Sequence, residues 1–430
     1  MHARSQRGHS DDLISYIQDS PSAYHAVAEG AQRLERAGFR ELCETEAWTG
    51  ATGGCYVVRD GTLIAWYAPP GTPAHTPFRI LGAHTDLPHL RVVQDPDTGS
   101  VGWRQIGTRA YGNLAPEGWA DRDLGVSGRL TLRDGTSRLV RVEEPLLRVA
   151  RPEGGRPRHS TPLWGLGGTD PGGLLGRVAA EADVEFYDVL GHDLVLHDMQ
   201  QPGYLGGARE FLVSARLDNL VSVHAGLTAL VCAAAAGEAS GAVPVLAAVD
   251  HDVTHEQGEP ATGGVFLERV LRRSVAARGG DREDWYRALG GTFGGVADLV
   301  RAVHPEDTEH HGRGAGLLPN GGPVVRTGRG PDCATDGRGL AVFAAACERA
   351  GIPWRTSDAD DVPSCGPGLG PLIAGRLAVP VVDIGVPGLS LHSARELCGA
   401  DDPWLLARAL TEFITAEHTD GKKGSARNDE

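Results

Sequence analysis

The sequence is short of positive charge. Its 430 residues include 41 lysines and arginines against 56 aspartates and glutamates, so the formal net charge is −15 at pH 7. Nucleic acids and anionic membrane surfaces are bound through basic faces, and neither is expected as the main partner. The length, together with 41% hydrophobic residues, allows a sizeable core and roughly two or three domains.

Long apolar runs and paired cysteines are also missing. No apolar run approaches the length of a membrane span, and the N-terminal residues lack the apolar segment of a secretory signal. The seven cysteines are scattered and form no Cys-x-x-Cys pair, which indicates reduced thiols rather than a disulfide scaffold. We therefore expect a cytoplasmic protein.

Three common catalytic signatures are absent: the GxSxG elbow, the phosphate-binding P-loop and the GxGxxG fingerprint. Residues 251–255, His-Asp-Val-Thr-His, imitate the HExxH zinc motif with Asp in place of Glu. The two histidines would share a face only on a helix, and this segment directly follows an expected buried strand. The pattern therefore disfavours an HExxH-type peptidase.

Strand-like and helical segments alternate along most of the chain. Apolar runs predict strands at 55–60, 62–68, 78–84, 210–216, 242–250 and 379–385. Helical spacing and caps predict helices within the first forty residues and at 218–237, 266–277, 339–351 and 403–414. This alternation predicts an α/β fold with a mostly parallel sheet covered by helices on both faces.

Residues 93–208 differ in amino-acid composition from the rest of the chain. They are rich in glycine, proline and arginine, with short strand-like pieces at 129–134 and 193–198 and an expected long loop over 151–173. We interpret 93–208 as an inserted β-rich domain, which leaves 1–92 and 209–416 for the α/β domain. The polar tail, 417–430, is expected to be disordered.

Acidic and histidine side chains follow several of the expected buried strands. The set comprises His84, Asp86, Asp218, Asp250, His251, Asp252, Asp298 and His392. Because ligands of open α/β sheets bind beyond the carboxyl ends of the strands, these side chains would converge and suit zinc, cobalt or manganese. Taken singly, such residues are more often caps or loop residues, and Asp218 is equally well placed to cap a helix. Spacing alone leaves both interpretations open.

Longer motifs carry more information. They include SPSAYHAV at 20–27, GAHTDLPHLRV at 82–92, WADRDLGVSGR at 119–129, SARLDNL at 214–220 and VDIGVPGLSLHSARE at 382–396. With these motifs the chain resembles the aspartyl aminopeptidases, a family of cytosolic dinuclear zinc exopeptidases. The resemblance extends from about residue 11 to 416.

The resemblance implies a catalytic α/β domain with two zinc ions, an inserted dimerisation domain and a homo-oligomer built from dimers, with a dodecamer as its expected size. It also implies removal of an N-terminal residue, typically Asp or Glu, from peptides. By motif, His84 and Asp298 would hold one metal, Asp218 would bridge both, and His392 would hold the second. Asp86 would orient His84, and a glutamate would act as the base towards water.

One stretch departs from the family. The family sequence reads Asp-His-Glu-Glu, in which the first Glu is the base and the second a metal ligand, whereas this chain has Asp250, His251, Asp252 and Val253. Without a gap, Asp252 replaces the base and Val253 replaces the ligand. With a gap of one residue, Asp252 would be the ligand and the base would be missing. A displacement on the order of 1 Å can lower a rate about a hundredfold.

Three functions are compatible with these patterns. The retained ligands and Asp252, interpreted as a shortened base, favour an aminopeptidase-like hydrolase with one or two zinc, manganese or cobalt ions and an altered second site. Its substrate would be a small peptide or an amide-containing metabolite. The alternatives are a diverged enzyme with other amide or acyl chemistry, and a non-catalytic member that binds a ligand or assembles with active subunits.

Overall fold

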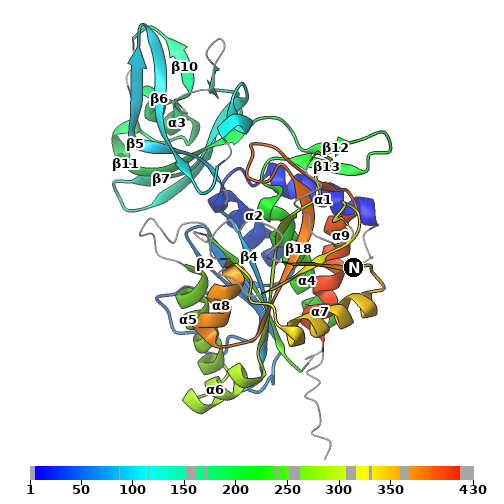
Figure 1. Cartoon of the computed structure of the whole chain (residues 1–430). Helices are drawn as coiled ribbons and strands as arrows, with labels where there is room; N and C mark the ends of the chain where they lie inside the picture. Colours follow the sequence, from blue (N-terminus) through cyan, green and yellow to red (C-terminus); the bar gives the residue numbers. More distant parts are fainter. Residues whose placement is uncertain are drawn as a thin grey trace, which may run out of the picture.

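The computed structural model describes residues 5–86, 88–114, 116–151, 161–168, 172–237, 241–250, 262–306, 316–328, 332–358 and 368–416. These residues form two β-sheets of different construction (Figure 1). The larger sheet has twelve strands with helices on both faces, and the smaller has seven strands curled beside one end of it. The predicted tail at 417–430 lies outside the described residues.

The larger sheet is mixed: it is parallel at its centre, and most of the strand pairs on either side are antiparallel. Strands β14, β4, β15 and β18 are neighbours and run parallel. In spatial order the sheet contains β1 (Arg40–Glu41), β2 (Gly53–Arg59), β3 (Thr62–Ala68), β14 (Val243–Val249), β4 (Phe78–His84), β15 (Phe293–Arg301), β18 (Val381–Leu389), β19 (Glu396–Gly399), β13 (Phe211–Ser214) and β12 (Gly203–Leu205), with β16 (Val324–Thr327) and β17 (Arg355–Asp358) off this path. The predicted α/β class is confirmed, with the parallel pairing concentrated in the strands that carry the site.

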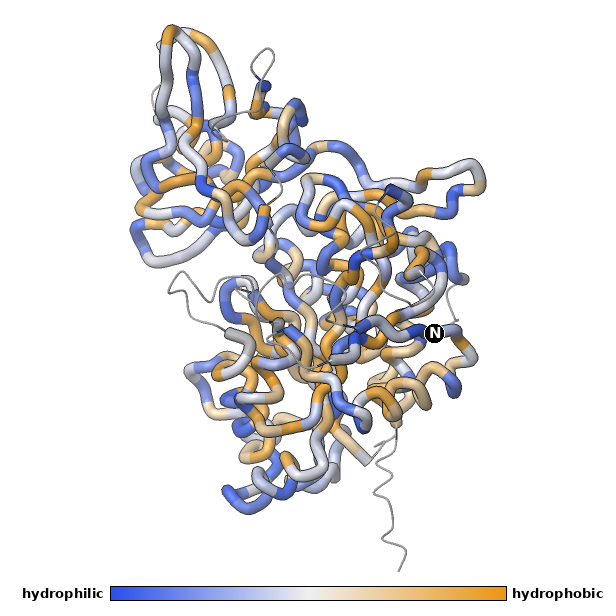
Figure 2. Tube along the Cα trace, in the orientation of Figure 1, coloured by the Kyte–Doolittle hydropathy of each residue, from blue (hydrophilic) through white to orange (hydrophobic). Residues whose placement is uncertain are grey.

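Helices cover both faces of this sheet and bury two hydrophobic cores. One face is covered by α1 (Gln6–Gln18), α2 (Ala23–Arg36), α4 (Leu217–Ala236), α7 (Gly337–Ala350) and α9 (Asp402–Thr415). The other face is covered by α5 (Thr262–Ala277), α6 (Arg282–Gly291) and α8 (Leu369–Leu377). In Figure 2 the hydrophobic colour is concentrated in the central strands and the helix faces that meet them. This two-sided burial explains why the central strands are continuous apolar runs rather than alternating ones.

Helix α4 lies inside the first of these cores. Its length and mean hydropathy would suffice to cross a membrane, but 67% of its most apolar window is buried within the protein. The expectation that no apolar run reaches this length was therefore wrong. Since α4 packs mainly against α9 and the central strands, we interpret it as a core helix.

The smaller sheet closes on itself. Its order is β11 (Val189–Asp198), β5 (His89–Ser100), β6 (Trp103–Tyr111), β10 (Leu163–Leu166), β9 (Leu147–Arg148), β7 (Asp123–Leu132) and β8 (Ser137–Arg141), and β11 also pairs with β7. This added pairing makes a barrel with its own hydrophobic core, which α3 (Gly173–Glu181) helps to cover. Two short 3₁₀ helices, η1 (Pro116–Trp119) and η2 (Phe186–Asp188), complete this region.

The barrel occupies the stretch in which an inserted β-rich domain is expected. Its strands run from residue 89 to 198, whereas β12 at 203–205 already belongs to the larger sheet. The domain limits at 93 and 208 stay a prediction. The expected loop over 151–173 is interrupted by β10, which pairs with β6, so that expectation was wrong for residues 163–166.

Candidate metal centre and substrate cavity

Three of the predicted ligands meet at the carboxyl end of the parallel strands. His84 ends β4 and Asp298 lies on the adjacent β15, while Asp218 is in the first turn of α4. The His84 Nε2 atom is 3.7 Å from Asp218 Oδ1 and 3.5 Å from Asp298 Oδ1. All three ligand atoms lie within 4.8 Å of one another, close enough to share a single cation. The fold therefore brings together side chains that are far apart in the sequence.

His392 approaches the same carboxylate from the opposite side. Its Nε2 atom lies 3.3 Å from Asp218 Oδ2, whereas His84 faces Oδ1. Asp218 thus presents one oxygen to each imidazole, which is the arrangement that a carboxylate bridging two metals requires. The side chains of Asp218, His84 and His392 are 6%, 10% and 16% exposed, so little water competes for them.

The tautomer of His84 is set by Asp86, but chiefly through its backbone. The His84 Nδ1 atom lies 2.7 Å from the carbonyl oxygen of Asp86 and 3.5 Å from its carboxylate. Because a carbonyl oxygen only accepts hydrogen bonds, Nδ1 carries a proton, which leaves Nε2 as the nitrogen that faces the cluster and could bind a cation. The Asp86 carboxylate in turn accepts a 2.7 Å hydrogen bond from the hydroxyl of Tyr111 on β6.

Glu396 is a further site residue that sequence reasoning did not single out. Its two carboxylate oxygens accept the backbone amides of Asp218 at 2.9 Å and His392 at 2.8 Å. Burial, followed by the nearby Asp218 charge, raises the pKa of Glu396 well above its usual value. Glu396 thus fixes the backbone of two candidate ligands at once. The available signal was an acidic residue four positions after His392, at the start of a short buried strand.

The charges of the cluster shift one another's protonation. Burial and the Asp298 charge raise the pKa of Asp218 to about 6. Burial would also raise the pKa of Asp298, but the His84 imidazole lowers it overall. Burial would lower the pKa of His84 and His392, yet the carboxylates of Asp298 and Asp218 raise both. The two imidazoles therefore hold protons that a divalent cation would replace.

The donor set fits zinc. Imidazole nitrogens and carboxylate oxygens are its usual non-cysteine ligands. Asp218 Oδ1 is buried and accepts no hydrogen bond from any residue in the described part of the chain. A buried carboxylate oxygen without a donor is costly, and a cation at this point would satisfy it. Asp252, the predicted base, lies outside the described residues.

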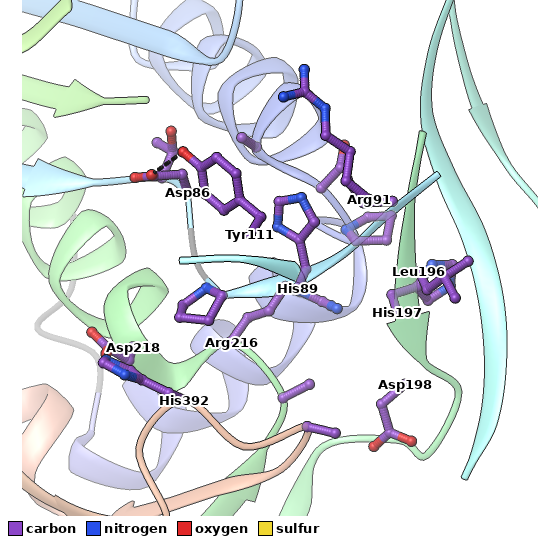
Figure 3. A pocket seen from close by; sticks show the side chains of 18 of the residues that line it. Asp86, His89, Arg91, Tyr111, Leu196, His197, Asp198, Arg216, Asp218 and His392 are labelled. Atoms are coloured by element: carbon purple, nitrogen blue, oxygen red, sulfur yellow. Dashed lines mark hydrogen bonds and ion pairs between the residues drawn. The ribbon is translucent and has the colours of Figure 1, made fainter. Parts of the chain in front are cut away.

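A cavity opens beside the candidate ligands, between the larger sheet and the barrel (Figure 3). Asp218 and His392 line one part of it, and the barrel strand β11 contributes His197 and Asp198 to another. The start of α2 and Arg216, just ahead of α4, also line it. The cavity thus extends from two of the candidate ligands to the barrel.

The sequence model of the aminopeptidase I zinc metalloproteases (M18) matches residues 16–152 and 169–414. The chain belongs to the M18 aminopeptidase family. It is 49% identical over 426 residues to a probable M18 family aminopeptidase 2 of Streptomyces coelicolor, covering 96% of this chain and 99% of the relative. It is 40% identical over 428 residues to a probable M18 family aminopeptidase 2 of Mycobacterium tuberculosis H37Rv, covering 94% and 98%.

Solved M18 structures share the fold. The crystal structure of prApe1 superposes with a TM-score of 0.87 at 25% identity and covers 95% of this chain and 94% of that one. An M18 aminopeptidase from Thermotoga maritima gives 0.82 at 17% identity, with 97% and 98% covered. The predicted family, the enzyme class of aminopeptidase-like hydrolases and zinc as the cofactor of the family agree with these findings.

Proposed function

We propose that this M18 protein hydrolyses the bond after the N-terminal residue of a small peptide or related amide, using divalent metal. The observation that carries the proposal is the meeting of His84, Asp218 and Asp298, with His392 on the second oxygen of Asp218. His84, Asp218 and Asp298 would hold one ion, and Asp218 with His392 would contribute to a second. Zinc is the expected metal, and manganese or cobalt would suit the same donors.

A bound ion there would lower the pKa of water and polarise the scissile carbonyl. The chain's own residues orient the metal ligands and transfer the proton. Asp86 keeps the proton of His84 on Nδ1, and Glu396 holds the backbone of Asp218 and His392. We assign proton transfer from water to the leaving amine to Asp252. One methylene shorter than glutamate, it would reach less far, so Asp252→Glu should raise kcat and Asp252→Asn should lower it.

The first test combines metal content with turnover. Protein exposed to excess zinc and then desalted should retain one or two ions per subunit by elemental mass spectrometry, and Asp218→Asn should retain none. A count near two ions per subunit would indicate that another residue supplies the ligand that Val253 cannot. A count near one would restrict metal binding to His84, Asp218 and Asp298. The absence of retained metal in the unmodified protein would contradict the proposal.

Turnover is measured on a panel of aminoacyl 4-nitroanilides with neutral, basic and acidic N-terminal residues. An aminopeptidase requires the free amine, so N-acetylated versions of the same compounds serve as matched controls. We expect hydrolysis of at least one free-amine compound and none of its acetylated partner. Retained metal without hydrolysis of any of them would favour other chemistry or a non-catalytic role.

We also propose that the protein is a homo-oligomer assembled from dimers. The solved relatives include a dodecamer of Saccharomyces cerevisiae mApe1. On the barrel, Val101, Trp103 and Leu166 are 93%, 47% and 69% exposed, and Trp103 pairs with Leu166 across neighbouring strands. Such adjacent exposed apolar side chains are typical of a contact surface. Light scattering coupled to gel filtration should give a mass of several chains, with twelve as the expected number.

A further inference from the structure

The connection between β18 and β19 carries His392 and has an uncommon backbone conformation. Ser390 and His392 have φ angles of 60° and 66°, in the left-handed region that residues other than glycine seldom adopt. Such a conformation persists where surrounding contacts enforce it. We call residues 390–395 the His392 loop. Because His392 Nε2 lies 3.3 Å from Asp218 (Figure 3), the contacts that hold this loop also place one side of the candidate metal centre.

Arg395 attaches the loop to the chain that returns from the barrel. Its guanidinium donates to the backbone carbonyl oxygens of Gln200 at 3.0 Å and Gln201 at 2.8 Å, and to that of Val213 at 3.5 Å. Gln200 and Gln201 belong to the short connection between the barrel strand β11 and β12. The side chain of Arg395 is 12% exposed, and Arg395 is not among the described residues that line the cavity. It is therefore placed to hold the loop rather than to touch a substrate.

A buried carboxylate reinforces this attachment. Asp198, at the end of β11, lies 3.6 Å from Arg395 and 3.3 Å from Arg122, and its side chain is 2% exposed. Arg122 also donates to the side-chain oxygen of Gln200 at 3.2 Å and to the carbonyl oxygen of Gly118 at 3.0 Å. Two guanidiniums thus share one carboxylate, which links the loop, the connection after β11 and the segment before β7.

The barrel also contacts the loop directly. Ala394 is 1% exposed and belongs to the hydrophobic core of the barrel, together with Trp119 of η1. A Cβ atom added to Gly118, also in η1, would lie 2.8 Å from the Cβ atom of Ser393, closer than two such atoms can pack. The missing side chain at Gly118 therefore permits this close approach. The loop is thus enclosed between the barrel and the chain that returns from it.

We propose that Arg395 is a positioning residue, which fixes His392 at the candidate metal centre by attaching its loop to the barrel. The inference rests on the proposed aminopeptidase function, because the attachment has a role in the reaction only if His392 binds metal. A ligand whose backbone is already held near its binding geometry loses less conformational entropy when the metal binds. Displacement of the loop from the barrel would therefore weaken metal binding.

The first test is Arg395→Lys, with zinc affinity measured by competition with a fluorescent chelator. Lysine keeps the charge, but its ammonium is a compact point charge that cannot reproduce the planar fork of the guanidinium. We expect about tenfold weaker zinc binding, the lower end of the loss that follows removal of groups orienting a ligand. Arg278→Lys is the matched control. Arg278 also donates to two backbone carbonyls, but it lies beside Phe78, at the opposite end of β4 from His84.

A double-mutant cycle distinguishes positioning from general stabilisation. Arg395→Lys is combined with His392→Ala, which removes the imidazole that the loop presents. If Arg395 acts through His392, Arg395→Lys should change zinc affinity by less than about twofold in the His392→Ala background. Equal losses in both backgrounds would show that Arg395 acts on the fold as a whole and would overturn the inference. An Arg395→Lys protein with unchanged zinc affinity would overturn it as well.

Gly118→Ala tests the barrel side of the same attachment. The added methyl group would displace the loop at Ser393, so it should weaken zinc binding in the same His392-dependent way. Gly191→Ala, on the barrel strand β11, is the control, because the nearest atom to a Cβ there belongs to Thr131 and is 4.0 Å away. An unchanged zinc affinity of Gly118→Ala would overturn the part assigned to the barrel.

Amide hydrogen exchange of the metal-free protein keeps the inference separate from the proposed function. The peptide with residues 390–396 should exchange faster in Arg395→Lys than in Arg278→Lys, because the loop loses its support. Equal exchange rates would overturn the attachment. If the unmodified protein retained no zinc, the proposed function would be contradicted, and exchange would decide on the attachment by itself. Retained zinc with equal affinities for the unmodified protein and Arg395→Lys would overturn the inference alone.

Discussion

Tyr111 connects the barrel to the candidate metal ligands, and its hydroxyl provides a sharp test of that connection. The phenol donates to Asp86 at 2.7 Å, and the two residues are 4% and 2% exposed. The backbone carbonyl of Asp86 in turn holds His84. Tyr111→Phe removes the hydroxyl while keeping the ring that stacks on His89 with centroids 4.7 Å apart.

The expected magnitude follows from this geometry. A hydrogen bond to a buried carboxylate contributes about 1.5–3 kcal/mol. Loss of an interaction that orients a metal ligand typically costs about 10- to 100-fold in metal affinity. Because Tyr111 acts through Asp86 rather than on His84 directly, we expect the lower end of that range, about tenfold weaker zinc binding. The assay is competition with a fluorescent zinc chelator at constant pH and ionic strength.

Tyr56→Phe provides the matched control. Tyr56 is 1% exposed, and its hydroxyl donates to Glu35 at 2.8 Å, away from the cavity. Both variants should lower the free energy of unfolding in the metal-free protein, but only Tyr111→Phe should weaken zinc binding. Equal zinc affinities for the two variants would refute the proposed connection through Asp86.

Three further predictions concern the same region and the core. Zinc affinity should fall as the pH drops, beginning above 6.5, because neighbouring carboxylates raise the pKa of His84 despite its burial and protons then compete with the cation. A zinc affinity that does not change between pH 8 and pH 6 would contradict this prediction. Glu396→Gln turns one of two acceptors into a donor facing a backbone amide, so retained zinc should decrease by tenfold or more, with Glu412→Gln on the surface as the control. Burial raises the pKa of Asp402 to about 6. Its stabilising contribution is then fully present below about pH 4 and is lost as the pH rises through 6, so the unmodified protein should lose about 2–3 kcal/mol of unfolding free energy over that window relative to Asp402→Asn, as measured by urea unfolding.

Much of the α/β portion was predictable because its signals are local. Strands β3 and β4 have the predicted bounds, and α4 differs from its predicted span by one residue at each end. Apolar runs of this length, ended by glycine or by polar residues, have few other ways to be buried. Helix α8 was missed because its first residues follow a glycine-rich segment, and it packs on β15 and β18, which are distant in sequence.

The candidate site likewise contains residues that could be predicted from the sequence and residues that could not. His84, Asp218 and His392 could be singled out because each follows a recognisable apolar run or motif, and Asp298 because it interrupts one. Their assignment as metal ligands stays a prediction. Glu396 lies in the segment 382–396, and its place four residues after His392 was the only local sign of its role, since the other amide it accepts, that of Asp218, is distant in sequence. Tyr111 and Arg395 become relevant only through neighbours on other elements.

By itself, the sequence determined the α/β class, the membership of the M18 family and the set of acids and histidines at strand ends, because these depend on periodicity and on motifs a few residues long. Only the tertiary structure decided which of those side chains share a cation-sized space, which backbone groups hold them, and that a barrel strand completes the cavity wall. Such facts depend on distances between segments that are not neighbours in the sequence, as with His84, Asp218 and Asp298. Those distances arise from packing of the two hydrophobic faces and closure of the barrel, and no local pattern encodes them.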